Sequence, residues 1–262
     1  MTQMPEGHVY LIGAGPGDPD LLTVKAMKAL SISDIVMYDR LVSNDILNLL
    51  RNKELIPVGK EHGKNPEIAQ NEINWMMLDY ALRGYTVARL KCGDPMIFGR
   101  GGEEAAFLVS HGISVEIVPG LTSAISLAEM VGVPLTHRGI SSSLTIISGH
   151  RAGNNDYDWR SIVNLGGTLV ILMSADTIGR VSNSLIDAGM PGDMPVCMVI
   201  NGSTPMQRVL FCRLSECEMV QRELNGPTTI IIGKVVDMAE KVQNITNPGE
   251  VYGIHSTDAQ YR

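Results

Sequence analysis

The chain has 262 residues, of which 44% are apolar and 19% are charged, and its formal net charge is -7. This length fits one large or two modest domains, and the apolar fraction is sufficient for a sizeable core. An acidic chain without a basic run argues against a nucleic-acid partner, although a local cluster of basic side chains would still allow an acidic small molecule to bind.

Signals for export, membrane insertion and metal binding are not evident. The first residues, MTQMPEGH, contain no basic segment followed by an apolar one, and no uninterrupted apolar run approaches the ~20 residues that cross a bilayer. The four cysteines (Cys92, Cys197, Cys212 and Cys217) show neither zinc-site spacing nor a CxxC motif. We therefore expect a cytoplasmic protein with reduced thiols, no membrane segment and no metal site.

The first half of the chain alternates predicted strands and helices. Apolar runs typical of buried strands lie at residues 9–12, 34–38, 54–58, 86–90 and 115–118. Helical periodicity or capping signals follow at about 19–30, 43–50, 69–80, 103–111 and 123–130. This alternation predicts an α/β fold with a parallel sheet covered on both faces, and Pro57 makes the third strand an edge strand.

The turn after the first strand resembles a dinucleotide-binding fingerprint but departs from it. G-x-G-x-x-G beginning at Gly13 requires glycine at position 18, where this chain has Asp18. A carboxylate there would repel a pyrophosphate at the helix N-terminus. Asp18 is instead a suitable N-cap, with Pro19 at the first helical position. The turn argues against NAD or FAD and remains compatible with a ligand that has no phosphate.

Three polar features follow predicted strands at the carboxyl edge of the sheet, where open α/β sheets bind ligands. The longest is the glycine-rich loop RLKCGDPMIFGRGGEE at 89–104, which would alternatively serve as a tight connection only. Asp39 follows the second strand, with an N-cap or an ion pair to Arg40 as the structural alternative. Lys60 follows the third strand, where a solvated lysine is the alternative.

The pattern of predicted elements changes in the second half, and we place a domain boundary at residue 138. Strands are expected at 144–148, 168–173, 195–200, 207–211 and 228–232, with helices ending near 188 and spanning about 215–224 and 234–242. This pattern predicts a mixed sheet with helices in a domain covering 139–243. Residues 244–262 are polar and aperiodic and are expected to form a tail.

Several separated stretches resemble the tetrapyrrole methylases, and within them most closely those that act on uroporphyrinogen III. The stretches are GAGPGDPDLLT (13–23), VMYDRLVS (36–43), VGK (58–60), RLKCGDPMIFGRGGEE (89–104), VPGLTSA (118–124), GVPLTHR (132–138) and SGH (148–150). The resemblance implies a homodimer with two α/β domains and S-adenosylmethionine in the cleft between them. It also implies transfer of two methyl groups to C2 and C7 of uroporphyrinogen III, through precorrin-1, to give precorrin-2 for siroheme, cobalamin or heme d1.

The same resemblance assigns cofactor-binding positions. They are Pro16, Cys92, Gly93, Asp94, Ile97, Thr122, Ser123, Met173, Gly202 and Thr228. Small residues and backbone groups would let a loop wrap closely around S-adenosylmethionine, and its demethylated product S-adenosylhomocysteine would leave from the same place. Asp94 would pair with the amino group or the ribose hydroxyls, and Met173 would supply a soft apolar wall.

The resemblance further implies catalytic and substrate-binding positions. Asp39, Lys60 and Arg100 match positions of the catalytic site, the first two for acid–base work. Arg40, Arg100, Glu103, His137 and Arg138 match positions around the substrate cleft. Uroporphyrinogen carries eight carboxylates, and arginine binds a carboxylate through two parallel hydrogen bonds. The alternative for each arginine is a structural salt bridge.

Some positions depart from the family pattern, and other functions stay open. Cys92 and Ser174 stand where the family usually has glycine, and Glu61-His62 follows Lys60 where a basic residue is more usual. A methylase of a later precorrin intermediate is the nearest alternative. A nucleotide-dependent dehydrogenase and a non-catalytic cofactor-binding module are the alternatives outside methyl transfer.

Overall fold

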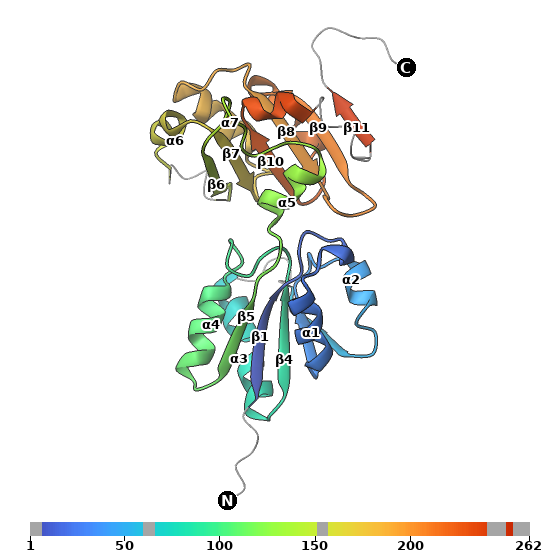
Figure 1. Cartoon of the computed structure of the whole chain (residues 1–262). Helices are drawn as coiled ribbons and strands as arrows, with labels where there is room; N and C mark the ends of the chain where they lie inside the picture. Colours follow the sequence, from blue (N-terminus) through green and yellow to red (C-terminus); the bar gives the residue numbers. More distant parts are fainter. Residues whose placement is uncertain (1–6, 60–65, 151–156, 240–249, 254–262) are drawn as a thin grey trace, which may run out of the picture. The chain divides into compact units, whose positions relative to one another are not determined.

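The computed structural model describes residues 7–59, 66–150, 157–239 and 250–253. The chain divides into two compact units, Met1–Thr122 and Ser123–Arg262. Each unit contains one sheet with helices on it (Figure 1).

The first unit is built on a parallel sheet of five strands. The strands are β1 (His8–Gly13), β2 (Ile35–Tyr38), β3 (Glu54–Pro57), β4 (Thr86–Lys91) and β5 (Ser114–Val118), in the order β3-β2-β4-β1-β5. β1 pairs in parallel with β4 and β5, and β2 pairs in parallel with β3 and β4. The parallel sheet predicted from the sequence is confirmed, and β3 with its Pro57 is an edge strand as expected.

Helices cover both faces of this sheet, and strand alternation divides the core accordingly. The helices are α1 (Val24–Ile32), α2 (Asn44–Asn48), α3 (Pro66–Leu82) and α4 (Gly101–Ser110). One cluster joins α1 and α2 to alternate strand residues such as Leu90. The other joins α3 and α4 to the intervening residues, such as Val87 and Met37. Side chains of a strand point alternately to opposite faces, so every second strand residue serves the same cluster.

The strand order places the loops that follow β1 and β4 next to each other. The chain leaves β1 toward β2 on one side, and it leaves β4 toward β5 on the other side. Such a reversal between adjacent parallel strands opens a crevice at their carboxyl ends, where α/β sheets bind ligands. The fold therefore brings together two stretches that are about eighty residues apart in the sequence.

The second unit contains a mixed sheet of six strands. They are β6 (Leu144–Ser148), β7 (Thr168–Leu172), β8 (Pro195–Ile200), β9 (Arg208–Arg213), β10 (Thr228–Ile232) and β11 (Glu250–Gly253), in the order β11-β9-β8-β10-β7-β6. β10 is antiparallel to both of its neighbours, β7 and β8, whereas β6 runs parallel to β7. One face packs against α5 (Ser123–Met130) and the other against α6 (Trp159–Leu165), α7 (Ile178–Asp187) and α8 (Cys217–Val220).

Five expectations differ from the structure. The segment after Asp18 is a short 3-10 turn, Pro19–Leu21, and α1 begins only after its own N-cap, Thr23. Two expected helices near 215–224 and 234–242 are short α and 3-10 pieces, within Leu214–Glu223 and at Lys234–Met238. Within the expected tail, Glu250–Gly253 forms a strand parallel to β9. Residues 123–138, which the sequence analysis assigned to the first domain, pack with the second unit because α5 is apolar toward its sheet.

Candidate active site

Three glycines meet backbone to backbone at the carboxyl edge of the first sheet. Gly13 ends β1, Gly93 follows β4 and Gly120 follows β5. A Cβ added to Gly120 would lie 2.4 Å from the Gly93 carbonyl oxygen, and one added to Gly13 would lie 2.5 Å from the Gly120 nitrogen. No side chain fits at that spacing, so glycine is required here for close approach of the three loops.

Hydrogen bonds hold these loops together. The backbone amide of Gly15 donates to the Gly93 carbonyl over 3.1 Å, and the Gly93 amide donates to the Gly15 carbonyl over 2.7 Å. The Asp94 carboxylate accepts from the Gly120 amide at 3.1 Å and from the Met96 amide at 2.8 Å. In the structure Asp94 therefore connects the loop after β4 to the loop after β5 and shapes its own turn.

The other cofactor positions expected in the first unit lie on the same loops. Pro16 is buried in the turn after β1, and Thr122 is half-buried after β5. Ile97 is 42% exposed and stands between the exposed Met96 and Phe98, so the loop after β4 presents an apolar surface. Phe98 and Arg100 have positive φ values of 52° and 59° in this loop. Such strained non-glycine conformations concentrate at ligand-binding loops.

Cys92 lies in the same loop with its thiol protonated. Burial raises the pKa of Cys92 to about 11, and the negative charge of Asp39 contributes to the rise. The sulfur lies 3.8 Å from the Gly15 carbonyl oxygen, which it contacts as a weak donor. A thiol with a raised pKa is a poor nucleophile at neutral pH, so Cys92 acts here as a small neutral side chain.

A cluster of buried charges lies beneath Asp39. Arg89 donates to Asp39 Oδ1 at 2.5 Å, and the Lys91 ammonium lies 3.7 Å from Asp39 Oδ2. Both cations also contact Glu104 Oε1, Arg89 at 3.2 Å and Lys91 at 3.0 Å. The side chains of Arg89, Lys91 and Glu104 are at most 4% exposed, whereas that of Asp39 is 32% exposed. Asp39 is therefore the one member of the cluster that a ligand can reach.

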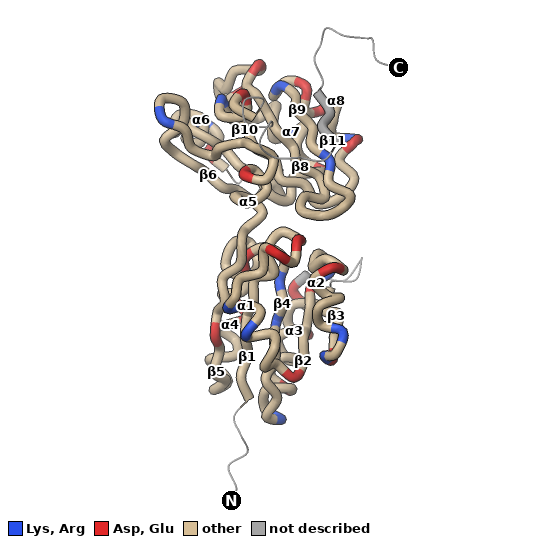
Figure 2. The backbone as a smooth tube through the Cα atoms, turned by 45° about the vertical axis from the view of Figure 1, so that its right-hand side comes forward, with Lys and Arg blue, Asp and Glu red and all other residues tan. Residues whose placement is uncertain are grey.

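The cluster continues into α3 and leaves one atom without a partner. Gln70 donates to Glu104 Oε1 at 2.9 Å and to Asn74 at 3.2 Å. Glu104 Oε2 is buried and has no hydrogen-bond partner within the described residues. Basic positions stand out within β4 in Figure 2. Removing one member of a buried ion pair commonly costs about 3–5 kcal/mol, so this cluster also contributes to stability.

Burial and the neighbouring charges shift the pKa values of Arg89 and Lys91 in opposite directions. Burial alone would lower the pKa of Arg89, but the charges of Glu104 and Asp39 outweigh it and raise that pKa. Burial lowers the pKa of Lys91, the adjacent Arg89 lowers it further, and Glu104 and Asp39 offset only part of the effect. Lys91 is therefore the more easily deprotonated of the two.

Arg89, Lys91 and Glu104 were not among the residues expected at the site. The signal in the sequence is the placement of two cations two residues apart in a strand that is otherwise apolar. Residues i and i+2 of a strand share a face, so a buried Arg89–Lys91 pair requires a buried counter-charge. The fold supplies Asp39 from the position directly after β2 and Glu104 from the first turn of α4.

The expected substrate-binding cations differ in their partners. Arg100 is bound by Glu103 through hydrogen bonds of 2.5–3.1 Å, and these raise its pKa. Arg40 and Arg138 are exposed, and neither guanidinium makes a hydrogen bond or ion pair with a described residue. His137 is half-buried, with Nδ1 2.9 Å from the Arg138 carbonyl oxygen. Lys60 lies outside the described residues.

Expected cofactor positions of the second unit lie together at one end of its strands. Met173 directly follows β7, Gly202 follows β8, and Thr228 begins β10, whose antiparallel register places it beside both strand ends. The Asn201 amide donates to the Pro227 carbonyl at 2.9 Å. Met173 has a positive φ of 57° and is 52% exposed. Ser123 is the first residue of α5, and the Gly202 backbone packs directly against Leu127 of that helix.

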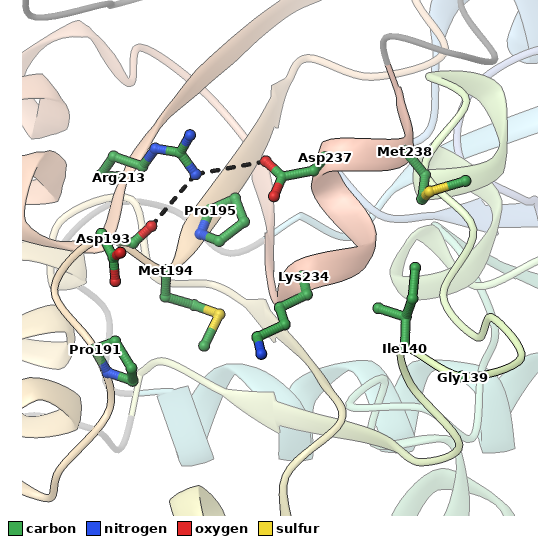
Figure 3. A pocket seen from close by; sticks show the side chains of 10 residues that line it. All are labelled: Gly139, Ile140, Pro191, Asp193, Met194, Pro195, Arg213, Lys234, Asp237 and Met238. Atoms are coloured by element: carbon green, nitrogen blue, oxygen red, sulfur yellow. Dashed lines mark hydrogen bonds and ion pairs between the residues drawn. The ribbon is translucent and has the colours of Figure 1, made fainter.

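A cavity of about 700 Å³ in the second unit does not include any expected site residue. It lies at the opposite end of the strands from Met173, where β8 begins and β9 ends (Figure 3). Arg213 is held there by Asp237 at 3.5 Å and by the Asp193 carbonyl at 3.3 Å. Two of its charged groups, those of Arg213 and Asp237, therefore pair with each other, and none of the expected site residues lines the cavity.

The described residues include neither a membrane-spanning helix nor a metal-binding cluster. Within 7–59, 66–150, 157–239 and 250–253, no helix is long and apolar enough to cross a membrane. Over the same ranges, no group of three or more His, Cys, Asp or Glu is arranged to hold a metal ion.

Comparison with known proteins identifies the family. The model of the Tetrapyrrole (Corrin/Porphyrin) Methylases matches residues 8–218. The chain belongs to the tetrapyrrole methylase family. This confirms the resemblance inferred from the sequence motifs and the α/β fold with one parallel and one mixed sheet.

Several tetrapyrrole methylases are similar over most of the chain. An Arabidopsis thaliana chloroplastic S-adenosyl-L-methionine-dependent uroporphyrinogen III methyltransferase is 44% identical over 239 residues, covering 89% of this chain and 64% of its own length. A siroheme synthase of Escherichia coli O1:K1 / APEC is 42% identical, covering 92% of this chain and 53% of its own. The chain thus spans between half and two thirds of these relatives.

Solved structures agree with this fold. Uroporphyrin-III C-methyl transferase from Thermus thermophilus, complexed with S-adenyl homocysteine, superposes with a TM-score of 0.77 at 41% identity and covers 88% of this chain and 99% of its own. A cobalt precorrin-4 methyltransferase superposes with a TM-score of 0.78 at 28% identity, covering 88% of this chain and 96% of its own.

Proposed function

We propose that this protein is an S-adenosylmethionine-dependent uroporphyrinogen III C-methyltransferase. It would methylate C2 and then C7, through precorrin-1, to give precorrin-2 for siroheme, cobalamin or heme d1. The observation that carries the proposal is the reachable Asp39 carboxylate, held by Arg89 and Lys91 next to the glycine loops at the carboxyl edge of the first sheet. The names of the relatives and of the Thermus thermophilus structure support the same reaction.

The loops fit a nucleoside-like ligand with a cationic sulfur. The loops after β1, β4 and β5 converge at Gly13, Gly93 and Gly120, and the exposed Ile97 adds an apolar wall. The residues that would hold S-adenosylmethionine are Pro16, Cys92, Gly93, Asp94, Ile97, Thr122, Ser123, Met173, Gly202 and Thr228. Asp94 already binds two backbone amides, so we assign it mainly to shaping the loop, with a ligand contact as its second role.

The chemistry asks little of the protein beyond alignment and proton removal. S-adenosylmethionine supplies a methyl group that is already activated as a sulfonium. The residues around these loops would hold the pyrrole carbon in line with that methyl group, which favours transfer without a strong base. Asp39 would then accept the proton that leaves a bridging carbon, because its carboxylate is accessible and fixed by Arg89. Lys60 would assist as a proton donor.

The eight carboxylates of the substrate require basic side chains at the site. Arg40 and Arg138 are exposed and available to such groups. Arg100 would bind a propionate or acetate while Glu103 fixes the orientation of its guanidinium. His137, beside Arg138, would contribute a further hydrogen bond. We assign these five residues to substrate binding, with Arg100 also acting at the reacting centre.

A second candidate substrate is a later precorrin intermediate. The similarity to a cobalt precorrin-4 methyltransferase, at 28% identity, supports the same fold for that reaction. The higher identity to uroporphyrinogen III methyltransferases favours uroporphyrinogen III.

We also propose that the protein acts in the cytoplasm as a homodimer. Sedimentation velocity would give about twice the chain mass of 28.4 kDa for a dimer and the chain mass itself if this proposal is wrong.

The deciding experiment is anaerobic turnover of uroporphyrinogen III with methyl-labelled S-adenosylmethionine, followed by mass spectrometry of the oxidised product. We expect a gain of two labelled methyl groups. Asp39→Asn should lower kcat by about 10²–10⁴-fold, because the variant loses the proton acceptor, and calorimetry should still detect binding of S-adenosylmethionine. The variant should also melt at a lower temperature, because Arg89 loses a counter-charge. Binding without any methyl gain in the natural protein would reject uroporphyrinogen III as substrate and direct the search to later precorrins.

A further inference from the structure

Phe98 is a large apolar side chain that core packing does not explain. It is 46% exposed, and its ring joins none of the four apolar clusters formed by the described residues. The other two phenylalanines do pack against clusters, Phe107 with α3 and α4, and Phe211 with α5. Burial is what makes a phenylalanine ring stabilise a fold, so a half-exposed ring outside the clusters contributes less of this stabilisation.

The backbone of Phe98 adds a conformational cost. Its φ is 52°, in the left-handed region that a residue with a Cβ disfavours. Glycine adopts this region without strain, yet the chain places its glycine at the next position, Gly99. Strain of this kind persists where a ligand site requires it, so Phe98 is a candidate for a functional contact.

Backbone contacts fix the turn that carries Phe98. The Gly101 amide donates to the Pro95 carbonyl at 2.9 Å, and the Ile97 amide donates to the Asp94 carbonyl at 3.4 Å. A Cβ added to Gly99 would lie 2.7 Å from the same Pro95 oxygen. The turn is thus closed on itself, so a ligand that meets the ring does not have to order the backbone first.

The neighbours of Phe98 indicate which ligand its ring would meet. Arg100 lies two residues further along the same turn and is also left-handed, with a φ of 59°. Its positive charge suits a carboxylate and opposes the sulfonium of S-adenosylmethionine. Pyrrole rings are electron-rich and aromatic, and such rings pair with phenylalanine in offset or edge-to-face contacts. A tetrapyrrole with peripheral carboxylates therefore matches Phe98 and Arg100 together.

We propose that Phe98 is a substrate-binding residue, whose ring packs against a pyrrole of uroporphyrinogen III while Arg100 holds a carboxylate of the same molecule. This inference rests on the proposed function. It extends recognition of the substrate from its carboxylates to its ring system, which distinguishes a tetrapyrrole from other compounds with several carboxylates.

The test measures binding of uroporphyrinogen III without turnover. Anaerobic equilibrium dialysis is done with S-adenosylhomocysteine present, because it carries no methyl group to transfer, and the tetrapyrrole is quantified after oxidation to the coloured porphyrin. Phe98→Leu keeps an apolar side chain and loses the aromatic contact, so the Kd should rise about three- to tenfold. Phe98→Gly removes the whole ring and should raise the Kd by about 10–100-fold.

Control variants separate a substrate contact from general damage. Phe98→Gly relieves the left-handed strain, so its melting temperature should stay close to that of the natural protein. Val109→Ala shortens another exposed apolar side chain, 61% exposed on α4, and should leave the Kd for uroporphyrinogen III unchanged. Ile97→Ala should weaken S-adenosylhomocysteine binding in calorimetry, whereas both Phe98 variants should bind it as the natural protein does.

The possible results distinguish a wrong contact from a wrong substrate. The inference alone is overturned if the natural protein and both Phe98 variants bind uroporphyrinogen III equally well. It is also overturned if the variants lose affinity for S-adenosylhomocysteine by the same factor. A natural protein that does not bind uroporphyrinogen III rejects the proposed substrate and this inference together. Binding without methyl transfer rejects the proposed reaction, and a selective loss of affinity in the Phe98 variants then still supports the ring contact.

Discussion

At the scale of single residues, the site depends on glycines, which have no side chain. Gly13 ends β1 and Gly120 follows β5, and each allows its backbone to approach the Gly93 carbonyl more closely than a Cβ permits. A side chain at either position would push two loops apart rather than simply fill a gap.

Replacement of one of these glycines should damage both stability and cofactor binding. Gly120→Ala places a Cβ 2.4 Å from the Gly93 carbonyl oxygen, and such overpacking costs about 1–3 kcal/mol. We expect a lower melting temperature and a weaker affinity for S-adenosylmethionine by calorimetry. Gly102→Ala is the control, because its Cβ would lie 3.7 Å from Met96 and it stands in a helix, where alanine is favoured. Equal effects of the two substitutions would contradict this explanation.

Chain order alone locates some of the candidate residues, whose roles stay predictions. Asp39 comes directly after β2 and Gly93 two residues after β4, so a parallel sheet places them at the same end of their strands. Arg89, Lys91 and Glu104 were missed because their importance lies in partners that only the folded chain supplies. The pairing of Arg100 with Glu103, three residues apart on the start of α4, was readable as a structural alternative and is present.

At the scale of elements, α2 and the first turn are connected through one hydroxyl. Ser43 caps α2 by accepting from the Ile46 amide at 3.3 Å, and it donates to the Gly17 carbonyl at 2.5 Å. The Ser43 hydroxyl thus caps α2 and also fixes the turn after β1, which carries Pro16. Thr23 performs the capping function alone at α1, where it accepts from the Ala26 amide at 3.0 Å.

This difference provides a matched pair of variants. Ser43→Ala and Thr23→Ala should each lower the free energy of unfolding by about 1 kcal/mol, because each removes an N-cap. Only Ser43→Ala frees the turn after β1, so only it should raise the KM for S-adenosylmethionine several-fold. Denaturant unfolding and steady-state kinetics measure the two effects. A KM increase of similar size in both variants would show that loss of stability, and not the turn, is responsible.

The bounds of elements were predicted well where an apolar run ends at a clear break, and poorly where local turns compete with a helix. β6, β8 and α5 have the predicted bounds, because apolar runs or small-residue periodicity end at clear breaks. The segment from Leu214 contains the capping pair Arg213–Glu216 and short turns, so an apparent helix divides into pieces. The strand Glu250–Gly253 is only four residues long, and its pairing with β9 lies outside what local sequence can indicate.

At the scale of the whole molecule, the two units have separate cores. Two apolar clusters lie entirely within residues 9–118, and the other two lie within 124–239. The segment from the start of α5 to β6 therefore belongs energetically to the second unit. Its buried apolar side chains are Ala124, Leu127, Ala128, Val131, Val133 and Leu135.

Two fragments test this assignment. A chain of residues 123–262 should unfold cooperatively, whereas one of residues 139–262 should not. The shorter fragment loses four buried leucine and valine side chains worth about 6 kcal/mol or more in total, comparable to the whole stability of a small domain. Circular dichroism during heating distinguishes the two, and residues 7–122 serve as a folding control. Equal melting of both second-unit fragments would support a boundary near residue 138.

The central place of β10 has a consequence for protein synthesis. This strand, Thr228–Ile232, lies between β7 and β8, which precede it by up to sixty residues in the chain. As the chain leaves the ribosome, β7 and β8 emerge with open edges that only the later strand can fill. Until then the second unit exposes two templates for wrong pairing, and a premature stop before residue 228 would make this exposure permanent. The nascent protein should thus depend on chaperones longest in its second half.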